Sequence, residues 1–377
     1  MGMKRCGVTS PKLLLFMLLL CFSSLCCAGP QSTQTGQLSL LKTSESQAEE
    51  IRGIYVVVRP SDKLDLEKVF ALDYVSGVSY VIAWKRIQPE QNSLQFDEID
   101  RAVSAAAKFK KKINLVVLAG KYSPEWIYSK GSKKATFTRS LNEAQVESER
   151  SPVVETPLPW DNDFVKVWTE TVKELAARYD NAESVGYVMI TGANLAAFTV
   201  GMAVRGAREE DVLRRLRENG YTESKWVGAW QNTIDLFFAN FKKKPLCLGL
   251  APLFDNAEPV IKIADYGVSK YGNRLYLLGD YLNGKWFANL KKGNQVQRIT
   301  DYISASQGRT RTGFQMLWWS AFNNGAVNGP LDKALDNGLR LGVSWLEVWN
   351  QDVIDSGEPV TENAKVLRAA NKKLVSR

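Results

Sequence analysis

From Ile51 to the C-terminus, short apolar runs alternate with longer segments in which apolar residues recur at every third or fourth position. Short apolar runs bounded by polar turns are typical of strands, and longer periodic segments are typical of helices. Because the alternation repeats without a break in composition, it predicts βα units around a parallel sheet. Strands are expected at residues 53–58, 78–84, 113–119, 185–191, 245–251, 275–279, 313–318 and 343–348.

The segments between the strands carry helical stripes that are more often packed on a sheet than used to bind a ligand. Asp161 is a suitable N-cap for the helix before the fourth strand, because its carboxylate can accept a free backbone N–H. The stripe of that helix is Phe164, Val167, Trp168, Val172 and Leu175. The stripe between the fourth and fifth strands is Trp226, Trp230, Ile234 and Phe237.

Eight such units predict an α/β protein with a single (β/α)8 TIM barrel over residues 51–377. An open doubly wound sheet would have a Gly-rich phosphate turn after its first strand, but residues 59–62 read Arg-Pro-Ser-Asp, which disfavours it. Two longer insertions, 121–160 and 193–222, follow the third and fourth strands. Both leave from carboxyl ends of strands, where barrels build their sites.

The N-terminal residues have the pattern of a targeting segment. Basic residues up to Lys12 precede an apolar run at 13–22, and small residues follow up to Ala28. This predicts a signal peptide at 1–28 that is too short to span a bilayer, and a secreted or periplasmic protein. Residues 29–50, rich in Gln, Ser and Thr, are expected to be a flexible tether. A lipid anchor on one of the cysteines before Ala28 is the less favoured alternative.

The composition limits which catalytic groups, metals and partners the protein can use. Four of the five cysteines precede Ala28, so the mature chain keeps Cys247 alone and no internal disulfide is expected. The net charge of +9 is spread over the chain without interleaved aromatic residues, so a nucleic-acid partner is not expected. The chain has no histidine, which excludes imidazole as base or metal ligand. We expect no metal and no cofactor, and carboxylates remain as candidate catalytic groups.

The last strand-like run carries one acidic side chain, Glu347, among apolar and aromatic neighbours. Its alternation places Trp345, Glu347 and Trp349 on one face and Leu346 and Val348 on the other. Both faces are largely apolar, as in a parallel strand that is covered on both sides. A charged side chain in such a strand therefore needs a structural or a functional explanation.

Glutamate is almost never fully buried without a partner, which leaves two interpretations of Glu347. It is either the ion-pair partner of Arg59 or Arg86, which both follow strand ends, or it lies at the carboxyl end of its strand and faces a cavity. The polar residues 350–352 mark the exit into a loop and favour the cavity.

Several stretches resemble TIM-barrel glycoside hydrolases of the clan that includes family 5 endoglycanases and family 42 β-galactosidases. The stretch Val-Ile-Ala-Trp at 81–84, with Ile-Gln-Pro-Glu at 87–90, is similar to the second-strand segment of that clan. Ser-Pro-Glu-Trp at 123–126 and Pro-Trp-Asp at 159–161 are similar to the end of the third strand and the entry into its helix. The resemblance implies the barrel and a sugar-sized cleft.

The chain departs from that clan at both catalytic positions. The resemblance implies a general acid/base Glu at the end of strand four and a nucleophilic Glu at the end of strand seven. Here strand four leads to Asn194 without a nearby carboxylate, and strand seven carries Gln315. Neither family carboxylate can be transferred to this sequence.

Glycoside hydrolysis requires two carboxyl groups at a defined separation. Glu347 and Asp280 are the preferred catalytic pair, and because they come from strands two apart, the wider separation of inverting enzymes is the more reachable one. Asp280 is also consistent with a turn-forming role. Asp352 and Asp255 also follow strands, but their surroundings indicate that they order a loop and a turn.

Aromatic residues at or beyond strand ends are candidates for sugar stacking, because sugar rings present apolar C–H faces. The candidate substrate-binding residues are Trp84, Trp126, Tyr281, Trp318, Trp319 and Trp349, with Asn194, Gln315 and Lys121 as hydroxyl ligands. The alternative is that tryptophans fill the barrel interior, which is favoured for Trp345 and for one of the pair Trp318 and Trp319.

Two hypotheses follow, both with an oligo- or polysaccharide as partner. The first is a secreted glycoside hydrolase with a displaced carboxylate pair. The second is a non-catalytic pseudo-glycosidase that binds glycan through aromatic residues. The sugar, the linkage and the oligomeric state are not indicated by the sequence.

Overall fold

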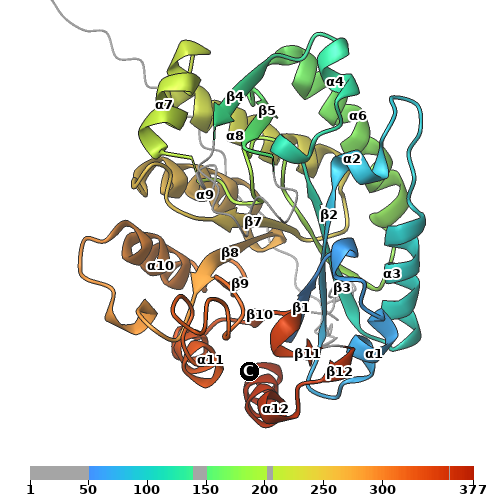
Figure 1. Cartoon of the computed structure of the whole chain (residues 1–377), viewed down its shortest axis with the longest axis vertical. Coiled ribbons are helices and arrows are strands. Elements are labelled where there is room, and N and C mark those ends of the chain that lie inside the picture. The colour runs from blue at the N-terminus through green and yellow to red at the C-terminus, as the bar shows by residue number, and fades with distance from the viewer. Residues whose placement is uncertain (1–50, 139–150, 202–206, 356) are drawn as a thin grey trace, which may run out of the picture. The chain divides into compact units, whose positions relative to one another are not determined.

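The computed structural model describes residues 51–138, 151–201, 207–355 and 357–377. Within them, parallel strands form a closed barrel in the order β1-β10-β9-β8-β7-β6-β3-β2 (Figure 1). The strands of the barrel are β1 (Gly53–Val58), β2 (Gly77–Ala83), β3 (Lys112–Leu118), β6 (Val185–Met189), β7 (Leu246–Leu250), β8 (Leu275–Leu282), β9 (Thr312–Met316) and β10 (Trp345–Trp349). The predicted (β/α)8 TIM barrel is confirmed, with every strand at its expected place in the sequence.

Helices follow the strands and cover the outside of the barrel (Figure 1). They are α1 (Leu66–Ala71), α2 (Trp84–Ile87), α3 (Asp97–Lys108), α4 (Trp126–Ser129), α6 (Asn162–Tyr179), α7 (Glu209–Glu218), α8 (Glu223–Asn240), α9 (Glu258–Tyr271), α10 (Gln295–Ala305), α11 (Leu331–Arg340) and α12 (Thr361–Val375). Asp161 caps α6 by accepting the N–H of Phe164 at 3.1 Å, as predicted. The expected stripes of α6 and α8 are buried, apart from a partly buried Val167.

Apolar side chains form two layers, one on each face of the strands. Leu346 and Val348 point outward into the layer between sheet and helices. Trp345 points inward and packs with Tyr187 and Tyr276 at ring distances of 5.9 and 5.8 Å. The predicted alternation of the last strand is therefore confirmed, as is the place of Trp345 in the barrel interior.

The two long insertions both lie beyond carboxyl ends of strands. The first contains α4 and the antiparallel hairpin of β4 (Lys134–Thr138) and β5 (Val153–Pro157). The second begins with a buried stretch in which Val200 donates to the carbonyl of Gly249 at 2.9 Å, and Phe198 packs in the interior layer. This stretch covers the barrel end beside β7. A small antiparallel pair, β11 (Ile354–Asp355) and β12 (Glu358–Pro359), follows β10.

The expected signal peptide at 1–28 and tether at 29–50 lie outside the described residues. In the part of the chain that the structure describes, no helix combines the length and the apolar character that crossing a bilayer requires. Cys247 is a free, buried cysteine of β7.

Candidate functional site

Glu347 lies in the middle of β10 with its side chain inside the barrel. Its neighbours across the ladder are Tyr55 on β1 and Gln315 on β9. Its carboxylate accepts hydrogen bonds from the hydroxyls of Tyr187 at 2.5 Å and Ser79 at 2.7 Å. The side chain is 1% exposed, so it does not face an open cavity, which differs from the favoured expectation.

The alternative expectation, an ion pair with Arg59 or Arg86, is wrong. Arg59 contacts Asp62 at 3.3 Å, and Arg86 contacts Glu98 at 2.6 Å. Each guanidinium pairs with a carboxylate in the segment that follows the same strand, outside the barrel. Hydroxyl groups inside the barrel stabilise Glu347 instead.

Burial raises the pKa of Glu347, while hydrogen bonds from Tyr187 and Ser79 oppose that shift. Burial, and secondly the nearby Glu347, raise the pKa of Tyr187 well above its usual value, and the same two causes act on the pKa of Cys247. All three groups are therefore held toward their neutral forms.

Asp280 lies on β8 in the irregular part of the ladder between Gly279 and Leu282. Gly279 is the partner of Phe314 on β9, and the next residue of β9, Gln315, pairs with Glu347. Asp280 is 4% exposed, and burial raises its pKa to about 7.

The structure thus brings the two predicted catalytic acids, Glu347 and Asp280, to strands on either side of β9. No hydrogen bond between described residues joins them, and neither carboxyl is among the groups that shift the pKa of the other. Their joint role in catalysis stays a prediction.

The two other strand-end acids have structural surroundings. The carboxylate of Asp352 accepts the N–H of Ser320 at 3.0 Å and its hydroxyl at 2.5 Å, so it orders the loop after β9 and not only its own loop after β10. Burial raises the pKa of Asp352 to about 6. Asp255 is exposed in a turn at a φ of 51°.

Aromatic side chains form one continuous surface beyond β9 and β10, which we call the aromatic platform: Trp318, Trp319, Phe322 and Trp349. Trp318 stacks on Trp349 with ring centres 5.6 Å apart and on Phe322 at 4.7 Å. Trp319 packs edge-on against Trp318 and Phe322. The Arg59 guanidinium lies 5.2 Å from the Trp349 ring centre. The platform joins three residues of the loop after β9 with the last residue of β10.

The expectation that one of Trp318 and Trp319 fills the barrel interior is wrong, because both lie in the loop after β9 and are half-buried. Sequence reasoning also missed Phe322. Its spacing of four residues from Trp318 was a signal, but the segment 319–327 has no regular helix that would have justified using it.

Three other candidate aromatic residues lie apart from the platform. Trp84 is fully buried, 4.8 Å from the Trp168 ring, and Tyr281 packs between Phe287 and Phe314. Neither ring has a face open to a ligand, unlike the expectation from their places in the sequence, because helices and loops beside the strand ends cover them. Trp126 is half-buried and donates to the carbonyl of Gln88 at 3.0 Å.

The predicted polar ligands are spread over the barrel end. Asn194 is buried and accepts the N–H of Gly192 at 2.7 Å, while its amide nitrogen has no partner among the described residues. Gln315 is buried between the two acids, and the Lys121 ammonium lies 4.9 Å from the Tyr122 ring centre. Among the described residues, no cluster of three or more acidic or cysteine side chains could hold a metal ion.

No protein-family model matches this sequence, and neither does any curated protein. Among solved structures, the β-galactosidase from the psychrophilic Marinomonas ef1 is similar with a TM-score of 0.53 at 11% identity, covering 85% of this chain and 59% of that one. The β-galactosidase from the Antarctic haloarchaeon Halorubrum lacusprofundi has a TM-score of 0.55 at 11% identity, covering 86% and 58%. Endo-glycoceramidase II from Rhodococcus sp., in a cellobiose-like isofagomine complex, has a TM-score of 0.51 at 10% identity, covering 84% and 79%.

This chain shares the fold of its barrel with these solved structures. The resemblance inferred from sequence is thereby confirmed for the fold. At such low identity the similarity does not extend to individual residues. The chain spans less than two thirds of the length of either β-galactosidase.

Proposed function

We propose that this protein is a secreted carbohydrate-binding barrel that does not hydrolyse the glycan it binds. The observation that carries the proposal is the aromatic platform, because stacked rings at the carboxyl end of a barrel, three of them half-buried, are suited to the apolar faces of sugars. The Arg59 guanidinium beside Trp349 adds a donor for hydroxyl groups.

The state of the two acids supports binding over hydrolysis. A glycosidase needs one protonated carboxyl group and one ionised carboxylate, both in contact with the sugar. Burial raises the pKa of both Glu347 and Asp280, so neither environment favours the ionised nucleophile or base. In addition, the Glu347 carboxylate is enclosed by the Tyr187 and Ser79 hydroxyls.

Hydrolysis is the second candidate, and one observation favours it. Asp280 carries a carboxyl group whose pKa of about 7 is suited to a proton donor at neutral pH. In this alternative, Asp280 protonates the leaving oxygen and Glu347 is the second acid, which requires the barrel end to open around it.

Calorimetry with a panel of oligosaccharides tests the binding proposal. Trp318→Ala is expected to weaken the best glycan about tenfold, the equivalent of about 1.4 kcal/mol, because it removes the ring on which both Trp349 and Phe322 stack and so disrupts the platform. Trp286→Ala is the matched control, since Trp286 is a half-buried tryptophan of the loop after β8, outside the platform. Equal affinities of the two variants would contradict the platform as the binding site.

Prolonged incubation of the same glycans with the protein separates the two candidates. The binding proposal expects no new reducing ends, and Asp280→Asn is expected to leave glycan affinity within about twofold, a difference below 0.5 kcal/mol. Release of reducing ends that Asp280→Asn abolishes would establish the hydrolase instead.

Secretion rests on the pattern of residues 4–28. The exported protein is expected to begin at Gly29, which intact mass measurement checks. A mass that includes residues 1–28, or one that carries a lipid on Cys26 or Cys27, would contradict a freely secreted chain.

A further inference from the structure

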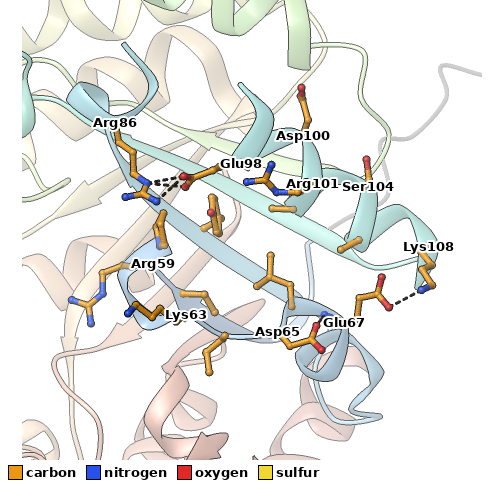
Figure 2. A pocket seen from close by; sticks show the side chains of 17 residues that line it. Arg59, Lys63, Asp65, Glu67, Arg86, Glu98, Asp100, Arg101, Ser104 and Lys108 are labelled. Carbon is orange, nitrogen blue, oxygen red and sulfur yellow. Dashed lines mark hydrogen bonds and ion pairs between the residues drawn. The ribbon is translucent and has the colours of Figure 1, made fainter. Parts of the chain in front are cut away.

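A second concave site lies outside the barrel, where α1 and α3 flank the ends of β1 and β2. The pocket has a volume of about 730 Å³, a size typical of small-molecule sites (Figure 2). Its floor is formed by Val58 and Tyr80, which are partners across the β1–β2 ladder and point outward. The space above this floor stays open because the six-residue α1 extends only about 9 Å, while the two floor side chains themselves are 2% and 6% exposed.

The acidic side chains that line the pocket all have partners. Glu98 pairs with Arg86, and Glu67 pairs with Lys108, both at 2.6 Å, at opposite ends of the site (Figure 2). The remaining two acids are also occupied: Asp65 accepts the N–H of Glu67 at 2.9 Å and caps α1, and Asp100 pairs with Arg178.

Two cationic side chains that line the pocket have no partner among the described residues. Arg101 on α3 and Lys63 before α1 are exposed, and neither makes a hydrogen bond or an ion pair within the described residues. Arg101 is close enough to Tyr80 to act on its pKa. Cations match three of the four acids, and the remaining charge of Asp65 offsets only one of these two cations, so the unmatched charge of the pocket is positive.

Tyr80 supplies a hydrogen-bond donor inside the pocket. Its side chain is 6% exposed, and its hydroxyl has no hydrogen-bond partner among the described residues. The hydroxyl is not among the fully buried polar atoms that lack a partner, so it reaches the open space of the pocket. Burial raises the pKa of Tyr80 to about 12, so the hydroxyl remains a donor at neutral pH.

We infer that this pocket binds a small organic anion with an apolar body, such as an aromatic carboxylate. Arg101 and Lys63 face its charge, Tyr80 donates to an oxygen, and the apolar body contacts Val58 and Leu66. The site is separate from the aromatic platform and does not depend on the proposed carbohydrate function.

Titration calorimetry of the whole protein with 2-naphthoate tests the inference, with the neutral 2-naphthalenemethanol as matched probe. The anion is expected to bind at least tenfold more tightly than the alcohol. Arg101→Gln is expected to weaken 2-naphthoate about tenfold, and Tyr80→Phe about fivefold, because each removes one hydrogen bond to the anion. Lys372→Gln, which removes an exposed cation of α12, is expected to leave the affinity unchanged.

Three results would overturn the inference: no binding of 2-naphthoate, equal affinities for the anion and the alcohol, or equal effects of Arg101→Gln and Lys372→Gln. If Arg101→Gln fails to fold by circular dichroism, Lys63→Gln takes its place with the same expected direction. Glycan binding by the unmodified protein is unaffected by any of these results, so the two proposals fail separately.

Discussion

Glu347 shows how a barrel interior holds a carboxyl group without a cation. The Tyr187 and Ser79 hydroxyls donate to one carboxylate oxygen, and Ser79 in turn accepts from the Asn114 amide at 3.1 Å. A buried guanidinium would bring a second desolvation cost, which the attraction between the two charges often fails to offset. Neutral donors avoid that cost and still satisfy the acid.

Tyr187→Phe is expected to lower the free energy of unfolding by about 2 kcal/mol at pH 8, because it removes a hydrogen bond to a buried acid. The loss is expected to be smaller at pH 5, where Glu347 is more protonated and depends less on the donor. Urea denaturation at both pH values measures the difference. Tyr276→Phe, on the neighbouring interior ring, is the control, and an equal loss in both variants would contradict this account.

Asp280 shows how an ionisable group inside the barrel lowers the stability of the folded protein. Its folded pKa of about 7 lies above the unfolded value, so the folded state holds the proton more tightly. Stability is therefore lost as pH rises from about 4 to about 7, by up to about 4 kcal/mol for three pKa units.

Asp280→Asn removes the charge and keeps the shape, so it is expected to stabilise the protein at pH 8 by a few kcal/mol. The gain is expected to vanish at pH 4, where the aspartate is protonated. Urea denaturation of both proteins measures it. The exposed Asp255→Asn serves as control, and a gain that does not depend on pH would contradict the raised pKa.

Single elements of the barrel depend on local signals that are visible in the sequence. The carboxylate of Asp161 accepts the N–H of Phe164 at the start of α6 and also that of Lys133 at 3.1 Å. One residue thus caps the start of a helix and holds the preceding loop against it by a hydrogen bond.

Asp161→Ala is expected to destabilise the protein by about 2 kcal/mol, because it leaves two backbone donors without their acceptor. Thermal or urea denaturation measures the change. Asp163→Ala, an exposed acid in the first turn of α6, is the control and is expected to cost less than about 0.5 kcal/mol. Equal losses would show that α6 does not need the cap.

Helix length matters as much as helix position. A six-residue α1 leaves a pocket open above Val58 and Tyr80, whereas the eighteen-residue α6 buries seven side chains along its length. The stretch after β6 closes a part of the molecule instead of leaving it open, because Phe198 covers the barrel interior beside β7. The concave site with unmatched charge therefore lies on the wall of the barrel.

The barrel as a whole has acids whose pKa values are shifted in opposite directions. Burial raises the pKa values of Glu347, Asp280 and Asp352, whereas hydrogen bonds from Arg368 and Arg178 lower those of Asp73 and Asp100. Ionisation of the buried acids destabilises the fold as pH rises through neutrality. The surface acids lose their stabilising contribution as pH falls below about 4.

The stability of the whole protein is therefore expected to be highest near about pH 5 and to fall on both sides. Urea midpoints measured from pH 3 to pH 9 check this expectation. In the Asp280→Asn variant the decline above pH 5 is expected to be smaller. A maximum at pH 8 would contradict the raised pKa values of the interior acids.

Much of the fold was predictable because it depends on patterns within single elements. Strand alternation around Glu347, the stripes of α6 and α8 and the cap at Asp161 are local properties of the chain. Sequence spacing also placed Asp280 and Gln315 on strands next to or near that of Glu347, since consecutive βα units occupy neighbouring positions in a barrel.

The partners of Glu347 depended on contacts between distant parts of the chain. Ser79 and Tyr187 lie 268 and 160 residues from it in sequence, and no local pattern distinguishes them from other hydroxyl-bearing residues. The same holds for the stacking of Trp318 on Trp349, and for the pocket that a short α1 leaves open. Local periodicity determines which face of an element is buried, whereas the identity of its neighbours follows from barrel closure, which brings together strands that are far apart along the chain.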